Sequence, residues 1–170
     1  MTCAATALDG VTTFTPDIFE DHRGYYVETF NLRDYRAAGV SVAFVQDDIS
    51  VSRKGVLRGL HGDARTWKLV SCLWGEIYLV VLDCREASPT RGQWQAFTIS
   101  DRNRQQVLVP PGVANGHLVL SDRAMFHYKQ SEYYEPGSQF TVAWNDPAYG
   151  IWWPVDTPIL SARDRGAPRS

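Results

Sequence analysis

Short apolar runs recur along the whole chain, and turn-forming Gly, Pro, Asn and Asp residues separate many of them. The runs are rich in β-branched and aromatic residues, a composition that predicts β-strands. Strands separated by turns at short intervals are typical of sandwiches and barrels, so we expect an all-β protein with a double-sheet jelly-roll barrel. The expected strands are Val11–Thr15, Tyr25–Phe30, Leu69–Leu73, Glu76–Asp83, Trp94–Ile99, Gln105–Val109, His117–Leu120, Ala124–Gln130 and Gln139–Trp144.

One of these strands differs from the others because its apolar residues fall on both faces. Glu76–Asp83 reads EIYLVVLD. A strand with this pattern is expected at the centre of a sheet, where a second layer or a partner subunit covers each face.

Helices are expected to be few, one or two short ones. Asn31 can cap a helix over Leu32–Ala38, and Gly39 can end it. The Pro-rich C-terminal segment, Pro154–Pro168, is expected to run as an extended strap over the body.

Length and composition indicate a globular protein. A chain of 170 residues fits one domain, residues 1–170, with a core large enough to need no disulfide or metal. Hydrophobic residues make up 44% and charged residues 21%, ordinary values that exclude a disordered or fibrous chain. Aromatic residues make up 12%, with six Trp and eight Tyr, which favours strands and a stacking or sugar-binding pocket over a helical bundle.

Charge and cysteine content limit the partners and the location. A net charge of -2 argues against nucleic acid as a partner, because phosphate binding needs a basic surface. No membrane association is expected, since the longest uncharged apolar run, Ile77–Leu82, is too short to span a bilayer. The expected location is cytoplasmic, because Met1–Leu8 lacks the basic start of a signal peptide. Cys3, Cys72 and Cys84 lack CxxC spacing and are expected to be buried free thiols.

Two short segments carry candidate catalytic residues. In the RGLH run, Arg58 precedes His61 and Lys68 follows it, which makes His61 a candidate base with cationic neighbours in a Gly-containing loop. The alternative is a hydrogen-bonded structural His. In the run FHYK, alternation along a strand puts Phe126 and Tyr128 on one face. If that face is internal, Tyr128 is a candidate proton donor, the alternative being a core Tyr bonded to a carbonyl.

The segment PPGVANGH, residues 110–117, bears on metal binding. Many small double-sheet barrels use such a turn to present a metal-ligating His, together with an HxH pair and a Glu earlier in the chain. Asn115 stands at that position, and the chain has no HxH pair. A catalytic metal usually needs three good ligands, so neither a metal nor another cofactor is expected.

Taken together with further motifs, these residues resemble a known family. The additional motifs are Asp21–Gly24 (D-x-R-G), Gln46–Ser50, Asp83–Thr90, Trp144–Pro147 and Ile159–Asp164. In this order they are similar to the dTDP-4-dehydrorhamnose 3,5-epimerases, a family of metal-free cupins. The resemblance runs from about Val11 to Asp164.

The resemblance implies a role for each matched residue. His61 corresponds to the family's base, Asp164 to the carboxylate that orients it, and Tyr128 to the acid on the opposite face of the sugar. Lys68 corresponds to the cation that stabilises the enolate oxygen. The implied diphosphate ligands are Arg23 and Arg58, and the implied nucleotide-end residues are Phe19, Glu28, Gln46 and Asp48. The family also implies a homodimer with strand exchange, in which Arg23 serves the neighbouring active site.

Departures from the family pattern concern the sugar. Gly62 and Asp63 follow His61 where many members read RGLHYQ, Asn115 replaces a His, and His117 replaces a Phe. All four positions are expected to lie around the sugar, and Asn115 and His117 are expected to contact it. They are similar to the variant found in epimerases of 4-keto heptose nucleotides.

The implied activity is epimerisation of a nucleotide-linked 4-keto 6-deoxyhexose or heptose at C3, C5 or both. A 3,4-ketoisomerase with the same barrel and a non-catalytic sugar-nucleotide binding module are the alternatives. A metal-dependent cupin oxygenase is a third, which Asn115 disfavours.

Overall fold

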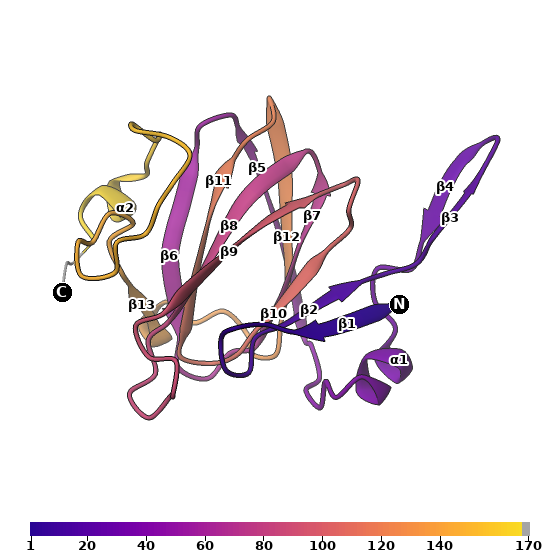
Figure 1. Ribbon diagram of the computed structural model, residues 1–170, viewed down its shortest axis with the longest axis horizontal. Helices are drawn as coiled ribbons and strands as arrows, with labels where there is room; N and C mark the ends of the chain where they lie inside the picture. The colour runs from indigo at the N-terminus through magenta and orange to yellow at the C-terminus, as the bar shows by residue number, and fades with distance from the viewer. Residues whose placement is uncertain (168–170) are drawn as a thin grey trace.

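Two antiparallel sheets form the body of the molecule in this computed structural model, which describes residues 1–167 (Figure 1). The six-stranded sheet has the order β1 (Thr2–Ala5), β2 (Thr12–Thr15), β10 (Gln106–Val109), β7 (Lys68–Trp74), β12 (Arg123–Gln130) and β5 (Gln46–Arg53). The five-stranded sheet has the order β13 (Gln139–Thr141), β6 (Leu57–Asp63), β11 (Val113–Val119), β8 (Glu76–Asp83) and β9 (Trp94–Ser100). A separate hairpin consists of β3 (Ile18–Asp21) and β4 (Gly24–Val27).

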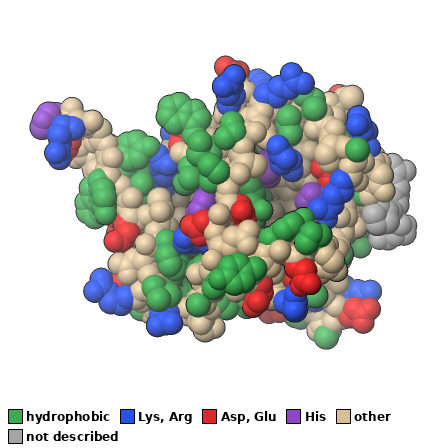
Figure 2. Space-filling view, turned by 180° about the vertical axis from the view of Figure 1, so that it is seen from behind, with side chains coloured by type: hydrophobic (Ala, Val, Ile, Leu, Met, Phe, Trp, Pro, Cys, Tyr) green, Lys and Arg blue, Asp and Glu red, His purple; other side chains and the backbone are tan. Residues whose placement is uncertain are grey.

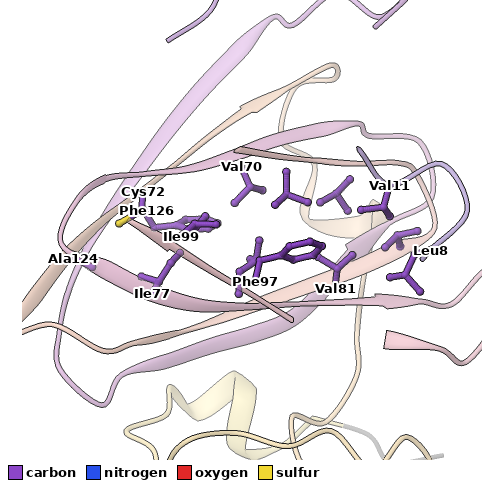
Figure 3. Close-up of a cluster of buried hydrophobic side chains, with 14 of the residues drawn as sticks. Leu8, Val11, Val70, Cys72, Ile77, Val81, Phe97, Ile99, Ala124 and Phe126 are labelled. Atoms are coloured by element: carbon purple, nitrogen blue, oxygen red, sulfur yellow. The ribbon is translucent and has the colours of Figure 1, made fainter. Parts of the chain in front are cut away.

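The main core lies between the two sheets, where side chains from both point toward one another (Figure 3). Val70 and Phe126 come from the six-stranded sheet, and Ile77, Leu79 and Val81 come from the facing β8. Burial of apolar area, worth roughly 25 cal/mol per Å², therefore fixes the two sheets as facing layers.

The outer face of the five-stranded sheet is also covered. Val80 and Leu82 of β8 pack there with Leu118 and with Trp153 of the C-terminal segment. The prediction that Glu76–Asp83 is a central strand buried on both faces is therefore confirmed. Because the chain itself provides both layers, this strand needs no partner subunit.

Two short α-helices lie outside the sheets, α1 (Leu32–Ala37) and α2 (Ala162–Arg165), together with the 3-10 turn η1 (Pro136–Ser138). The capping of α1 by Asn31 is confirmed, since its side chain accepts a hydrogen bond from the Arg33 backbone N–H. No helix among residues 1–167 is long and apolar enough to cross a membrane.

Several local predictions were wrong. The RGLH segment was expected in a loop but forms part of β6, and β1, β3 and β5 were not predicted. The predicted strap contains α2 and a parallel bridge between Ile159 and Val56, while its last residue, Pro168, lies outside the described residues. Cys3 is exposed rather than buried, because it lies on the edge strand β1.

Candidate active site

A cavity of about 500 Å³ opens between the two sheets next to α2. Figure 2 shows histidine, basic and acidic side chains gathered near the middle of one face of the molecule. The residues that line the cavity come from β5, β6, β7, β11, β12, β13, α2 and the segments before α2 and β13; they are Gln46, Asp48, Ile49, Ser50, Arg58, His61, Lys68, Asn115, His117, Phe126, Tyr128, Tyr134, Gln139, Ser161, Arg163 and Asp164.

An irregularity in β6 brings both Arg58 and His61 to the cavity. Arg58 pairs with His117 and His61 pairs with Asn115, so β6 has one residue more than β11 between these pairs. In a regular strand, residues three positions apart point to opposite faces, but a bulge restores a common face. Arg58 is held there by a hydrogen bond of 3.0 Å from its Nε to Ser52 Oγ.

His61 is hydrogen-bonded to a carboxylate from near the other end of the chain. Its Nε2 lies 2.7 Å from Asp164 Oδ1, and the Asp164 side chain is only 2% exposed. Ser161 caps α2 and donates from Oγ to Asp164 Oδ2 over 2.9 Å, which fixes the carboxylate. Burial would raise the pKa of Asp164, but the hydrogen bonds from His61 and Ser161 outweigh it and hold the pKa below its usual value. Asp164 therefore stays ionised and orients the imidazole.

Tyr128 faces the same cavity from the opposite sheet. As predicted, Phe126 and Tyr128 point inward, whereas Lys129 points outward and donates to Asp47 over 2.6 Å. Tyr128 makes no hydrogen bond to a carbonyl within the described residues, which argues against a purely structural phenol. Burial, followed by the charge of Asp48, raises its pKa. The phenol is therefore protonated at neutral pH and available as a donor.

Lys68 is a buried cation, 8% exposed, whose Nζ lies 6.0 Å from the centre of the Tyr128 ring. It has no ion-pair partner among residues 1–167. Burial lowers its pKa, and the charge of Asp63 only partly opposes this effect. An unpaired buried ammonium is costly, so the site is suited to stabilise negative charge that arrives or develops in the cavity.

The polar residues of β5 and β11 complete the cavity wall. Asp48 Oδ2 accepts hydrogen bonds of 2.8 Å from both Gln46 and Gln130. Asn115 and His117 are buried, and their Oδ1 and Nε2 atoms have no hydrogen-bond partner within the described chain.

Three of the implied site residues do not line this cavity. Arg23 is exposed near the tip of the β3–β4 hairpin, which projects from the body (Figures 1 and 2), and it pairs with Asp21. Phe19 is 62% exposed on the same hairpin, and Glu28 is an exposed residue that accepts a hydrogen bond from Asn31. The chain alone therefore does not bring these three together with His61.

Gly62 and Asp63, which were expected around the sugar, do not line this cavity. A Cβ at Gly62 would lie 2.1 Å from the Phe140 ring, so the glycine is required by packing against β13. Asp63 is buried and accepts hydrogen bonds from the backbone of Arg65 and Thr66 and from Ser138.

Comparison with known proteins extends this picture. A sequence model of the dTDP-4-dehydrorhamnose 3,5-epimerases matches residues 5–170. A relative of that name from Salmonella typhimurium is 44% identical over 168 residues, which cover 96% of this chain and 92% of the relative.

The chain belongs to the dTDP-4-dehydrorhamnose 3,5-epimerase family. This confirms the resemblance predicted from the sequence motifs. The relatives named above and below are epimerases, which does not favour the ketoisomerase or binding-module alternatives.

Solved structures of this epimerase family confirm the all-β barrel. The 3,5-epimerase from Legionella pneumophila, in complex with dTDP-4-keto-L-rhamnose, is 40% identical with a TM-score of 0.93, covering 98% of this chain and 90% of its own. A 3'-monoepimerase from Streptomyces bikiniensis in complex with dTDP-quinovose is 34% identical with a TM-score of 0.92, covering 96% and 85%.

Sequence reasoning missed part of the cavity wall. Arg163 and Gln139 both line it, and Arg163 donates to Gln139 Oε1 and to Thr141 Oγ1. Arg163 precedes Asp164 inside a motif that the epimerase family shares, so its position was a usable signal. Tyr134 offered none, because its segment had no predicted structure.

Proposed function

We propose that this protein is an isomerase that epimerises a nucleotide-linked 4-keto sugar at C3, C5 or both. The observation that carries the proposal is the cavity in which the His61–Asp164 pair, Tyr128 and the unpaired Lys68 converge. Membership of the epimerase family supports the same reaction.

Each of these side chains meets one chemical need of the reaction. A carbonyl at C4 makes the hydrogens at C3 and C5 removable, because the resulting carbanion is delocalised as an enolate. His61 accepts the proton, and the Lys68 ammonium stabilises the developing oxyanion. Tyr128 returns a proton to the opposite face of the same carbon, which inverts it. No step needs a metal or an organic cofactor, since side chains carry every proton and charge.

Base and acid come from opposite sheets, which suits inversion. His61 lies on β6 and Tyr128 on β12, so a sugar ring between the sheets has one group on each side. A positioned base and acid each contribute about 10²- to 10⁴-fold to such a reaction. Arg58 lines the same cavity and is suited to bind the diphosphate, because a guanidinium can form paired hydrogen bonds with phosphate oxygens.

Solvent exchange tests the reaction directly. The protein is incubated with dTDP-4-keto-6-deoxyglucose, and with other 4-keto sugar nucleotides, in D₂O, and deuterium at C3 and C5 is followed by NMR. We expect incorporation at one or both carbons. His61→Asn and Tyr128→Phe should abolish turnover while circular dichroism stays native.

His127→Asn is the matched control for the first variant, because His127 lies on the other face of β12 against Ser71 and Asp47. It should exchange deuterium at the wild-type rate. If no 4-keto sugar nucleotide takes up deuterium, the proposed function is wrong; if His61→Asn keeps its rate, His61 is not the base.

The identity of the sugar is a finer proposal. Asn115 and His117 add polar groups to the cavity wall, so a 4-keto heptose is proposed beside the 6-deoxyhexose that the names of the relatives mention. The nucleotide is proposed to be dTDP or GDP, to be identified by titrating each nucleoside diphosphate.

A homodimer with strand exchange is also proposed. The hairpin holding Arg23 and Phe19 projects from the body, and the six-stranded sheet exposes the large apolar side chains of Val51 and Trp74 away from the cavity. A partner subunit would bury these apolar groups and receive Arg23 in its own cavity.

We propose that residues 1–170 act as one catalytic domain. A cytoplasmic location is proposed because the cysteines Cys3, Cys72 and Cys84 are free, as is usual in a reducing compartment.

A further inference from the structure

Three aromatic rings pack against one another in a row beside the cavity, and all three line it. The ring of His117 stacks on Phe126, with ring centres 4.1 Å apart and planes 15° apart. The ring of Phe126 in turn packs against Tyr128, with ring centres 5.5 Å apart. His117 lies on β11 of the five-stranded sheet, whereas Phe126 and Tyr128 lie on β12 of the six-stranded sheet. The row of rings therefore links the two sheets.

The base and the acid lie on the two sheets that this row of rings joins. His61 is on β6, and the residue of β11 that pairs with it is only two positions from His117. Facing sheets are about 10 Å apart, and side chains fill the space between them at close packing. A ring from each sheet, in direct contact, therefore fixes the local separation of the sheets. The same contact fixes how far Tyr128 stands from His61 across the cavity.

The phenol of Tyr128 has no hydrogen bond to hold it. Its hydroxyl makes none within residues 1–167, and its partners in the strand ladders, Asp48 and Val70, lie beside it in the same sheet. Phe126, by contrast, packs its ring against the phenol and is only 5% exposed. The position of the phenol therefore depends on packing, and Phe126 is held in turn by His117.

His117 contributes the shape of its ring rather than a charge or a hydrogen bond. The side chain is 2% exposed, and its Nε2 has no hydrogen-bond partner within the described chain. Burial, followed by the charges of Arg58 and His61, lowers its pKa to about 3. The imidazole is therefore neutral at the pH at which an imidazole base such as His61 can accept a proton, and the stack does not change with its titration.

We propose that His117 is a positioning residue that acts through Phe126, because the stack holds the Tyr128 phenol where it can return a proton to the face opposite His61. This inference rests on the proposed function. Loss of the stack should slow the return of the proton by Tyr128 more than its removal by His61. A displacement of about 1 Å can slow such a step by about 10²-fold.

The fate of the enolate in D₂O separates these two steps. His61 breaks the C–H bond, and the electron pair enters the enolate. A deuteron then returns either from Tyr128, which inverts the carbon, or from His61, which gives a labelled sugar of unchanged configuration. NMR gives the initial rates of both products from dTDP-4-keto-6-deoxyglucose, or from the 4-keto sugar nucleotide that the wild-type protein inverts fastest. A general structural defect lowers both rates and leaves their ratio unchanged.

Four variants test the stack. His117→Leu and Phe126→Leu each remove one ring and should raise the ratio of labelled, uninverted product to inverted product at least about tenfold. His117→Phe keeps a ring on Phe126 and should stay within about threefold of the wild-type ratio. Its Tm should be no lower than that of the wild type, because a buried unpaired nitrogen is removed. His127→Leu, on the outer side of β12, is the matched control and should keep the wild-type ratio.

The outcomes are distinct, and Phe126→Leu serves if His117→Leu does not fold. A ratio that rises in the leucine variants but not in His117→Phe supports the positioning role. An unchanged ratio in a folded leucine variant, or an equal rise in His117→Phe, overturns it, while inversion by the wild-type protein leaves the proposed function intact. If the wild-type protein exchanges deuterium into no 4-keto sugar nucleotide, the proposed function is wrong, and the positioning role fails with it.

Discussion

Asp164 is placed to fix the orientation and the tautomer of the His61 ring, since it accepts a hydrogen bond of 2.7 Å from Nε2. Asp164→Asn keeps the shape of the side chain but can donate instead of accept, which favours the wrong tautomer. We expect kcat to fall by about 10²- to 10⁴-fold, measured as deuterium exchange. Asp47→Asn on the outer face is the control, and a kcat within threefold of wild type in Asp164→Asn would contradict the role.

Lys68 should set the alkaline limit of activity. It must be protonated to stabilise an enolate, and burial holds its pKa below the usual value of 10.5, whereas the pKa of Tyr128 is raised above its usual 10.0. As the pH rises, Lys68 therefore loses its proton at a lower pH than an ordinary Lys does, and kcat/KM falls. In Lys68→Arg the charge persists, so the fall should move to higher pH even though kcat is lower. Rate profiles between pH 7 and 11 test this, and superimposable alkaline limbs would rule Lys68 out as the titrating group.

The contact between β6 and β11 depends on a pair of glycines. Gly59 has φ +126°, and a Cβ there would lie 2.4 Å from Gly116 Cα. Gly59→Ala should therefore destabilise the protein by about 1–3 kcal/mol, seen as a Tm several degrees lower. Gly137→Ala is the matched control, because nothing lies within 4 Å of its added Cβ. Equal Tm values for the two variants would show that the strands can separate at no cost.

The bulge between β6 and β11 also explains which strands could be predicted from the sequence. Ala124–Gln130 was found because regular strands repeat every two residues, and this also placed Tyr128 inside. Glu76–Asp83 was found from its short continuous apolar run. β6 was missed because its bulge breaks that alternation, so the sequence offers no period by which Arg58 and His61 share a face. His61 was a candidate base only because Arg58 and Lys68 lie close to it in sequence, and the motif resemblance then matched it to the family's base.

At the scale of the whole molecule, the C-terminal segment has two tasks. It covers the outer face of the five-stranded sheet through Trp153, and it delivers Asp164 to His61 across 103 positions of sequence. Covering this sheet and completing the catalytic pair are thus coupled. No local pattern contains such a long-range contact, which is why only the order of the family motifs pointed to it.

The projecting hairpin carries Arg23, which can serve either the cavity of its own chain or the cavity of a partner subunit. Arg23 is exposed and does not line the cavity of its own chain. Arg23→Ala and His61→Asn should each be inactive at low substrate concentration. If the hairpins are exchanged, mixed dimers of the two variants contain one site with both His61 and Arg23 intact.

Co-expression of the two variants with different tags, followed by purification through both tags, isolates these mixed dimers. Each should have one active site of two, and therefore about half of the wild-type activity per dimer. A mixture of the separately purified variants, without exchange of subunits, is the control and should stay inactive. If the doubly tagged dimers are also inactive, Arg23 acts within its own chain, and if no doubly tagged species forms, the protein is not a dimer.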